Sequence, residues 1–240
     1  CVLNPDELIV TTGASEAVFL ALRAICRPGD TVAIGSPIYF NFVQMLEILD
    51  LRIIEIPNSP LEGLHLESLR HALEYNRIAC CLVVSNFDNP LGSSLSNERK
   101  EELVKLLQDA DVPLIEDDIN GDLCHEGDRP TVAKAWDNHG NVLLCSSFSK
   151  TLAPGYRVGW IAPGKYMDKV LHQKIVSNIA STSPTQLAVA EFLENGGYAH
   201  HLRTINRAYA TKVARMAEAI GNCFPAGTRV TRPTGGFALW

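Results

Sequence analysis

The sequence predicts an α/β fold in which a mainly parallel sheet is covered by helices on both faces. Two observations lead to this prediction. The chain of 240 residues is 46% hydrophobic, so it can bury a large core in one or two domains. Short apolar runs also alternate with longer segments of helical period. Such alternation is typical of strand and helix units that build a parallel sheet between two helical layers.

The alternation gives six strands and four helices before the pattern changes. Strands are expected over residues 7–11, 31–34, 52–56, 79–84, 113–117 and 142–146, and helices over residues 15–25, 40–49, 66–75 and 97–108. After residue 166 the pattern is mostly helical, with helices expected over residues 166–179, 185–195 and 198–220. Two short strand candidates follow, bounded by proline and glycine residues between Pro225 and Gly236.

Two domains of unequal size follow from this pattern. We expect a large ligand-binding domain over residues 1–210, and a connector with the beginning of a small C-terminal domain over residues 211–240. Cys1 enters a strand almost directly, and Trp240 closes a Gly-Gly-Phe-Ala-Leu-Trp run. We therefore expect both domains to be truncated and the chain to be a piece of a longer protein.

Charge and cysteine content exclude several classes of function. The net charge of -6 gives no general attraction to a phosphate backbone, so this chain is a poor candidate for binding nucleic acid itself. No apolar stretch is long enough to span a bilayer, and no secretory signal begins the chain. None of the seven cysteines forms a Cys-x-x-Cys motif, which favours reduced thiols. We expect a cytoplasmic protein without membrane contact.

Two turns that follow the first strands contain candidate ligand-binding residues. In open α/β sheets, ligands bind beyond the carboxyl ends of the strands. Thr12 to Ala17 joins a strand to a helix, and the free N–H groups of the first helical turn suit a phosphate. Ser15 is equally suited to a plain N-cap. The Ser36-Pro37-Ile38-Tyr39 turn can place the Tyr39 ring against a flat heterocycle, or Tyr39 can be a core residue at a turn.

Two later strands end in polar groups of different kinds. The segment from Asn86 to Gly92 can hold the Asn89 amide firmly between Pro90 and Gly92, although a plain turn would use the same residues. Leu114-Ile115-Glu116-Asp117-Asp118 places three acids at a strand end, where metal ligation competes with cofactor binding. No histidine or further acid lies at a convincing spacing, so we expect no metal site. One carboxylate beneath a protonated pyridine nitrogen explains the acids better.

The segment from Ser146 to Trp160 contains a hydroxyl, a lysine and an arginine in a short turn after a strand. A lysine amine can form a Schiff base with an aldehyde. Ser147 and Arg157 flank Lys150 and can bind a phosphate together. Taken alone, Lys150 would be an ordinary solvated lysine of a polar loop.

Taken in order, these motifs resemble the fold type I pyridoxal-phosphate enzymes of the class I/II aminotransferase family, over essentially the whole chain. The resemblance implies pyridoxal 5′-phosphate as the cofactor, bound covalently by Lys150, the lysine of the Ser-x-x-Lys motif. Asp117 would pair with the pyridine nitrogen, and Lys150 would move the proton of the substrate α-carbon. The other cofactor contacts implied are Ala14, Ser15, Ser147 and Arg157 on the phosphate, Tyr39 on the ring face, and Asn89 on the ring hydroxyl.

Two departures from the family pattern affect turnover. The family usually has a tyrosine three residues after the pyridine-binding aspartate, and this sequence has Asn120 there. An asparagine can supply a weaker hydrogen bond to the ring hydroxyl, so we expect cofactor binding to survive and turnover to suffer. The arginine that grips the substrate carboxylate lies beyond the Gly-Gly-Phe-x-x-Trp region in the family. We therefore do not expect this piece alone to transaminate.

Within the family, the sequence around Lys150 is most similar to the aminotransferase-like half of MocR-type regulators of the GntR family. The resemblance implies an effector domain that senses an amino acid or amine, in a homodimer that binds DNA through a separate N-terminal domain. The alternative is a working aminotransferase that transfers an amino group from an α-amino acid to a 2-oxo acid. Retention of Lys150, Asp117 and Arg157 disfavours a third possibility, a structural domain without cofactor.

Overall fold

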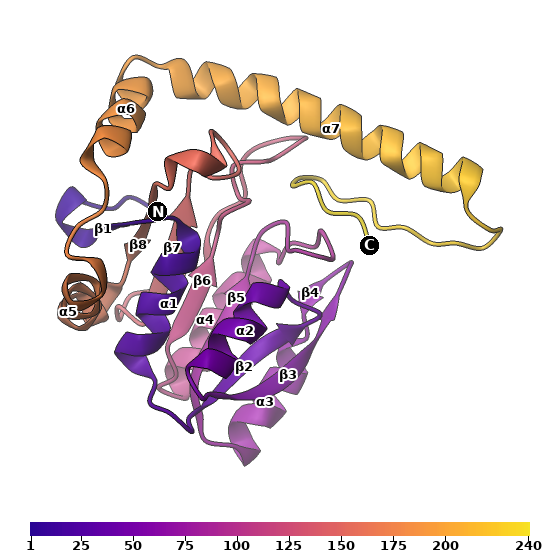
Figure 1. Ribbon diagram of the computed structural model, residues 1–240. Coiled ribbons are helices and arrows are strands. Elements are labelled where there is room, and N and C mark those ends of the chain that lie inside the picture. The colour runs from indigo at the N-terminus through magenta and orange to yellow at the C-terminus, as the bar shows by residue number, and fades with distance from the viewer.

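Eight strands form one sheet in the computed structural model, which describes residues 1–240 (Figure 1). The strand order is β1-β8-β7-β6-β5-β2-β3-β4. The strands are β1 (Ile9–Thr11), β2 (Thr31–Ser36), β3 (Arg52–Ser59), β4 (Gly63–Leu64), β5 (Ile78–Val84), β6 (Leu114–Asp117), β7 (Val142–Ser147) and β8 (Gly159–Ala162). The central pairs β3-β2, β2-β5, β5-β6 and β6-β7 are parallel, which confirms the predicted α/β fold.

Both faces of the sheet are covered by helices. The helices are α1 (Ala14–Ile25), α2 (Phe40–Ile48), α3 (Leu66–Tyr75), α4 (Asn97–Asp109), α5 (Met167–Asn178), α6 (Ser183–Glu194) and α7 (Gly197–Cys223). One core cluster joins the strands to α1, α2 and α5, and a second joins them to α3 and α4. Adjacent residues of β5 divide between the clusters, since Leu82 belongs to the first and Val83 to the second. Alternation of side chains along a strand explains this division.

Two strands were missed by the sequence prediction, the two-residue β4 and the longer β8. The segment Gly159–Ala162 forms β8, which pairs antiparallel with both β7 and β1. Only a three-residue 3-10 helix, Pro154–Tyr156, separates β8 from β7, so the alternation of strands and longer helices gave no signal for β8. The insertion of β8 places the end of β1 and the start of β8 at the same edge of the sheet as the end of β7.

The two strand candidates predicted after Pro225 do not form. That segment is extended but makes only one isolated bridge, between Gly235 and Cys124. Two backbone bonds join it to the loop after β6, from Gly236 N–H to the Leu123 carbonyl and from His125 N–H to the Thr234 carbonyl, and Thr231 N–H donates to the Trp240 carbonyl within the segment. The strand prediction failed because these few bonds, to a loop and within the segment, do not form a ladder with a neighbouring strand.

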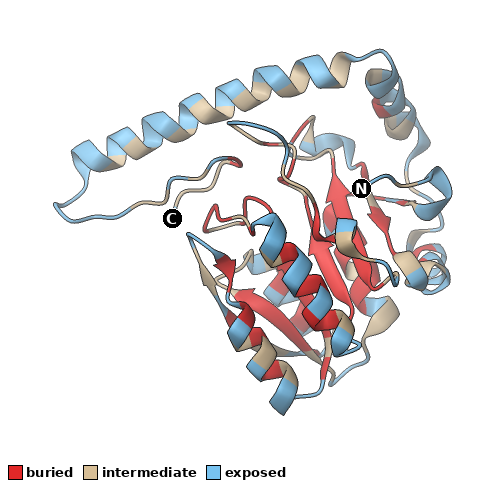
Figure 2. Cartoon of the chain, turned by 180° about the vertical axis from the view of Figure 1, so that it is seen from behind, coloured by how far each residue is buried: buried red, intermediate tan, exposed pale blue.

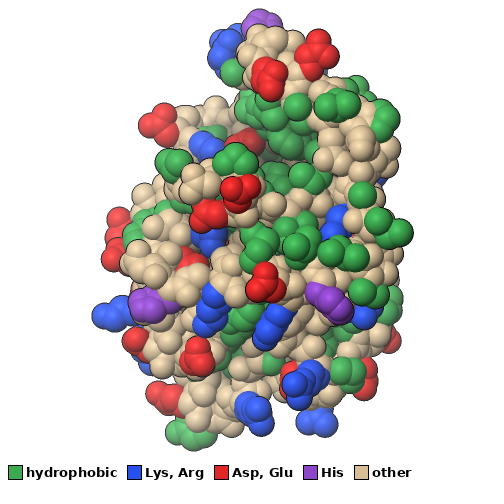
Figure 3. All heavy atoms as spheres, turned by 90° about the vertical axis from the view of Figure 1, so that its left-hand side faces the viewer, with side chains coloured by type: hydrophobic (Ala, Val, Ile, Leu, Met, Phe, Trp, Pro, Cys, Tyr) green, Lys and Arg blue, Asp and Glu red, His purple; other side chains and the backbone are tan.

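Helix α7 differs from the other helices in its burial. It has 27 residues and none is buried, whereas every residue of β6 and β7 is buried (Figure 2). Exposed hydrophobic side chains also gather on the face that contains α5 and α6 (Figure 3). They include Leu171, Ile175, Val176, Ile179, Leu187 and Leu193. No helix has the length and apolar character needed to cross a membrane.

Candidate functional site

A cavity of about 190 Å³ lies at the carboxyl edge of the sheet. It is lined by eight of the nine residues that the sequence singled out, namely Ala14, Ser15, Tyr39, Asn89, Asp117, Asn120, Lys150 and Arg157. They come from turns that are far apart in the sequence. The turns meet because β2, β5, β6 and β7 are parallel and end at one edge, where ligands of open α/β sheets bind.

Asp117 is the buried acid of the cavity. It is the last residue of β6 and is only 5% exposed. Its Oδ1 accepts a hydrogen bond from the Ile119 N–H over 3.1 Å, and no cationic side chain forms an ion pair with it. Burial raises the pKa of Asp117 to about 7, helped by the nearby acids Asp118 and Asp88. A cationic ligand group opposite Asp117 would therefore find an acid without a counter-ion.

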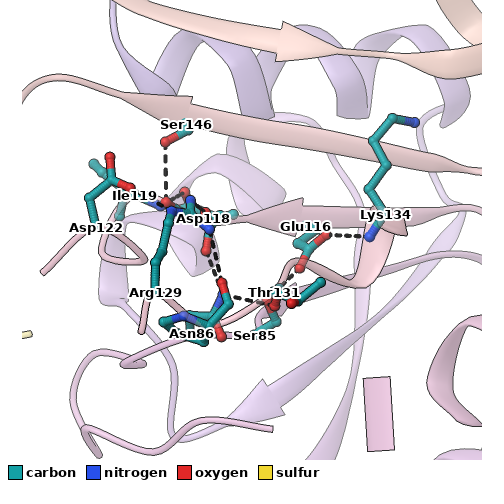
Figure 4. A network of polar contacts seen from close by, with 12 residues as sticks. Ser85, Asn86, Glu116, Asp118, Ile119, Asp122, Arg129, Thr131, Lys134 and Ser146 are labelled. Atoms are coloured by element: carbon teal, nitrogen blue, oxygen red, sulfur yellow. Dashed lines mark hydrogen bonds and ion pairs between the residues drawn. The ribbon is translucent and has the colours of Figure 1, made fainter. Parts of the chain in front are cut away.

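The acids on either side of Asp117 in the sequence, Glu116 and Asp118, bind other groups of the chain. Alternation along the strand directs Glu116 and Asp118 to the side opposite Asp117. Glu116 accepts from the N–H groups of Ala133 and Lys134, at 2.7 and 3.0 Å, and from the Ser85 hydroxyl. Asp118 accepts from the Asn86 amide at 2.7 Å and is paired with Arg129 (Figure 4). Because the three acids diverge, Asp117 alone faces the cavity.

The phosphate-binding turn predicted at Thr12 to Ala17 begins helix α1. The helix starts at Ala14, with Gly13 as the N-cap residue, so Ser15 is not the cap. Gly13 has a φ of +94°, and a Cβ there would lie 2.4 Å from Arg157 Nη2. Only glycine lets the guanidinium approach this closely. Arg157 thus lies beside the free N–H groups of the first turn of α1, a combination suited to an anion.

Arg157 and Glu16 hold the Thr12 peptide from both sides. Arg157 Nη2 donates to the Thr12 carbonyl over 2.8 Å, and the Thr12 N–H donates to the Glu16 carboxylate. Glu16 is itself paired with Lys174 of α5 over 3.2 Å, where the side chains are 17% and 5% exposed. These contacts hold the Thr12 turn in place within the chain itself.

The Lys150 turn differs from the prediction at one hydroxyl. Ser147 is the last residue of β7, is 5% exposed and does not line the cavity. Its Oγ accepts from the Ser149 N–H over 3.3 Å. Ser149 lines the cavity instead, and its Oγ accepts from Arg157 Nη1 over 3.2 Å. The sequence offered both serines, and only the end point of β7 decides which one reaches the cavity.

Lys150 is exposed toward the cavity and has no carboxylate partner. Its Nζ lies 5.4 Å from the centroid of the Phe237 ring. Phe237 was not expected at the site, because nothing in its sequence context shows that residues 234–236 fold back onto the loop after β6. The other apolar lining residues that the sequence did not single out are Phe42, Val84, Ile119 and Pro154.

Asn89, Asn120 and Tyr39 lie on the remaining walls. Asn120 is buried, and its Nδ2 donates to the Phe87 carbonyl over 2.9 Å. Since a carbonyl can only accept, this contact fixes which end of the amide is nitrogen. The Asn120 Oδ1 has no partner within the chain. Tyr39 precedes α2 and packs edge-on against Phe42, with centroids 5.6 Å apart.

Comparison with known proteins places these features in a family. The model of the family described as aminotransferase class I and II matches residues 2–240. The chain is 42% identical over 239 residues to the HTH-type transcriptional regulator YjiR of Escherichia coli, covering 100% of this chain and 51% of that protein. It is 28% identical to aromatic-amino-acid aminotransferase 1 of Thermococcus litoralis, covering 99% of this chain and 58% of that enzyme.

A solved structure is similar over nearly the same length. The α-aminoadipate aminotransferase LysN of Thermus thermophilus, complexed with N-(5′-phosphopyridoxyl)-L-leucine, matches with a TM-score of 0.92 and 25% identity. The match covers 98% of this chain and 61% of that one. The chain thus spans about half the length of the regulator and about three fifths of the two aminotransferases.

Proposed function

Because this chain belongs to the aminotransferase class I and II family, we propose that it binds pyridoxal 5′-phosphate and serves as the effector-sensing part of a transcriptional regulator. The observation that carries the proposal is the meeting of Lys150, Asp117 and Arg157 at one cavity. Each suits a different end of this cofactor: an amine for the aldehyde, a buried acid for the pyridine nitrogen, and a cation beside a helix N-terminus for the phosphate.

One buried polar group of the cavity lacks a counter-ion and another lacks a hydrogen-bond partner within the chain, and the cofactor offers a partner for each. Asp117 is buried without a counter-ion, and the Asn120 Oδ1 is buried without a hydrogen-bond partner. A ligand with a cationic ring nitrogen and a hydrogen-bonding substituent would satisfy both. The flat ring would lie against Tyr39. Ala14, Ser15, Ser149 and Arg157 would hold the phosphate, with Ser147 supporting Ser149 from beneath.

When bound, pyridoxal phosphate withdraws electrons from the α-carbon of an attached amino acid and acidifies its Cα–H bond. Asp117 would keep the ring nitrogen protonated, and its burial strengthens that interaction. Lys150 Nζ would hold the proton taken from the α-carbon. The apolar side chains of Phe42, Ile119 and Phe237 would exclude water from this region.

Relatives support the regulator over the enzyme. The regulators YjiR and YdcR of Escherichia coli are 42% and 38% identical to this chain, whereas the Thermococcus litoralis aminotransferase is 28% identical. We propose that the full protein binds DNA through a separate segment and senses an amino acid or amine. The retention of Lys150 and Asp117 supports the second candidate, an active aminotransferase.

Covalent trapping tests the cofactor proposal. The protein is incubated with pyridoxal phosphate, reduced with borohydride and digested, and the modified peptide is identified by mass spectrometry. We expect a phosphopyridoxyl group on Lys150, and none at this peptide in Lys150→Arg. Lys165, exposed and far from the cavity edge, is the internal control for nonspecific labelling. An unmodified Lys150 peptide in the wild-type protein would disprove the proposal.

The regulator and the enzyme are separated by two measurements on the full-length loaded protein. A regulator should bind operator DNA with an affinity that changes when an amino compound is added, and should convert a panel of amino acids only slowly. An aminotransferase should turn over at least one amino acid rapidly, with DNA having no effect.

We also propose a homodimer, supported by the exposed apolar side chains on α5 and α6. Sedimentation should give twice the mass of one chain. A charged substitution in this face, such as Val176→Glu, should give monomers, and a wild-type protein that sediments as a monomer would contradict the proposal.

A further inference from the structure

Helix α7 is attached to the rest of the chain by a small set of contacts around the cavity. None of its 27 residues is buried, so an extensive hydrophobic interface does not hold it in place. Apart from the contact of His201 with Phe192 of α6, its polar and aromatic side-chain contacts with other elements are made by Tyr198, Asn206 and Tyr209. Tyr198, Asn206 and Tyr209 all touch segments that form the cavity or support it. The position of α7 over the sheet is visible in Figure 1.

Tyr198 contacts both the lysine turn and the loop after β6. Its hydroxyl lies 2.9 Å from the Thr151 hydroxyl and donates to Asp122 Oδ2 over 3.0 Å. Its ring packs edge-on against Phe148, with centroids 5.6 Å apart. Thr151 directly follows Lys150 and is 2% exposed. Burial and the Asp122 carboxylate raise the pKa of Tyr198, so its hydroxyl stays protonated and can donate.

The contact continues from Asp122 to the acid of the cavity. Arg129 donates from Nε to Asp122 and from Nη2 to Asp118, the residue that follows Asp117 (Figure 4). The Asp122 carbonyl also accepts from the Asn206 amide over 3.0 Å. A continuous set of hydrogen bonds and ion pairs therefore runs from the residue after Lys150, through Tyr198 of α7, to the residue after Asp117.

A second contact joins α7 to another residue that lines the cavity. Tyr209 packs against Phe237, with centroids 5.8 Å apart, and the Phe237 ring lies 5.4 Å from Lys150 Nζ. Two points of α7, eleven positions apart, thus contact residues on two sides of the lysine. A ligand that fixes Lys150 would restrict both contacts.

We propose that Tyr198 is a positioning residue that holds the Lys150 turn and the Asp117 loop in one geometry and links cavity occupancy to the order of α7. This inference rests on the proposed binding of pyridoxal phosphate. If filling the cavity orders α7, then fixing α7 must strengthen binding by the same factor, because coupling between two sites is reciprocal. Helix α7 would then report cofactor binding to whatever segment contacts it.

Removing the Tyr198 hydroxyl tests the proposal while keeping the ring on Phe148. The full-length wild-type protein and Tyr198→Phe are titrated with pyridoxal phosphate, and amide hydrogen exchange of residues 197–212 is measured with and without it. In the wild type, we expect loading to slow exchange in this segment. In Tyr198→Phe, we expect an affinity about fivefold weaker, as for loss of one net hydrogen bond, and exchange that no longer responds to loading.

Two further variants distinguish a specific role of the Tyr198 hydroxyl from a general loss of stability. Thr151→Val removes the same contact from the side of the lysine turn and should reproduce both changes. Tyr75→Phe, at the exposed end of α3, should change neither. The pH dependence of the visible absorption band of the loaded protein should also shift in Tyr198→Phe and Thr151→Val, because the surroundings of Lys150 change. A purely destabilising substitution would leave that pH dependence unchanged.

The failures of the two proposals can be told apart. A wild-type protein that does not bind pyridoxal phosphate would disprove the proposed function itself. Normal binding by the wild type together with unchanged affinity and exchange in Tyr198→Phe would overturn only the role of Tyr198. Weaker binding with full protection of α7 would also overturn it, because Tyr198 would then act on the cavity without coupling it to the helix.

Discussion

Arg157 donates from Nη2 to the carbonyl oxygen of Thr12 over 2.8 Å, which joins the turn before β8 to the turn that begins α1. The same guanidinium contacts the Ser149 hydroxyl in the lysine turn. One cation therefore connects three turns that meet at one end of the cavity, where we propose that a phosphate binds. Its role in holding the turns and its proposed role in binding a phosphate can be separated by experiment.

Replacing Arg157 by lysine should weaken binding of pyridoxal phosphate about tenfold or more. Lysine keeps the charge but lacks the planar fork that contacts Thr12, Ser149 and a phosphate together. Affinity for pyridoxal, which has no phosphate, should change little. Fluorescence titration with both compounds measures the two effects. An equal loss for pyridoxal would mean that Arg157 shapes the cavity rather than recognises the phosphate.

A methyl group at Gly13 should destabilise the protein by about 1–3 kcal/mol. Gly13→Ala requires a positive φ for alanine and places the Cβ 2.4 Å from Arg157 Nη2. The displaced guanidinium should also lower the affinity for pyridoxal phosphate. Urea unfolding and a binding titration measure the two effects. Gly155→Ala is the matched control in the same region, since a Cβ there meets no atom within 4 Å.

Asp117→Asn should stabilise the cofactor-free protein at pH 8 and weaken cofactor binding. The pKa of Asp117 is raised from 3.8 to about 7 in the folded chain, so the folded state holds a proton that the unfolded state releases between these values. The stability that this proton contributes is present below pH 3.8 and is lost as the pH rises through 7.

Asparagine cannot ionise, so the variant escapes that loss. The free energy of unfolding of the variant should exceed that of the wild type by an amount that increases from pH 5 to pH 8 and reaches about 4 kcal/mol. Urea unfolding at several pH values, without cofactor, measures this difference. A constant difference across the range would show that Asp117 does not titrate there.

The ion pair between Lys174 and Glu16 should contribute more to stability than an exposed pair. Lys174→Met leaves the Glu16 carboxylate only 17% exposed and without its cation, which should cost about 3 kcal/mol. Lys165→Met breaks an exposed pair with Asp111 and should cost less than about 1 kcal/mol. Chemical unfolding of both variants gives the comparison, and similar losses would contradict it.

Eight of the nine residues that the sequence singled out line the cavity, but six further lining residues, among them Phe42, Ser149 and Phe237, were not predicted. Ala14, Ser15, Tyr39, Asn89, Asp117, Asn120, Lys150 and Arg157 follow a strand or precede one, and the carboxyl ends of parallel strands must share an edge. The divergence of Glu116 and Asp118 from Asp117 also follows from alternation along β6. These features depend on local periodicity and on strand direction, which neighbouring residues determine.

Only the tertiary structure decided the features that depend on where distant segments end. The end of β7 places Ser149 rather than Ser147 at the cavity, and the pairing of β8 with β1 brings Arg157 to Thr12. Phe237 and Tyr198 reach the site from the last third of the chain. No local pattern encodes such contacts, because the position of a loop or an exposed helix depends on the surface against which it packs. That surface is formed by residues far away in the sequence.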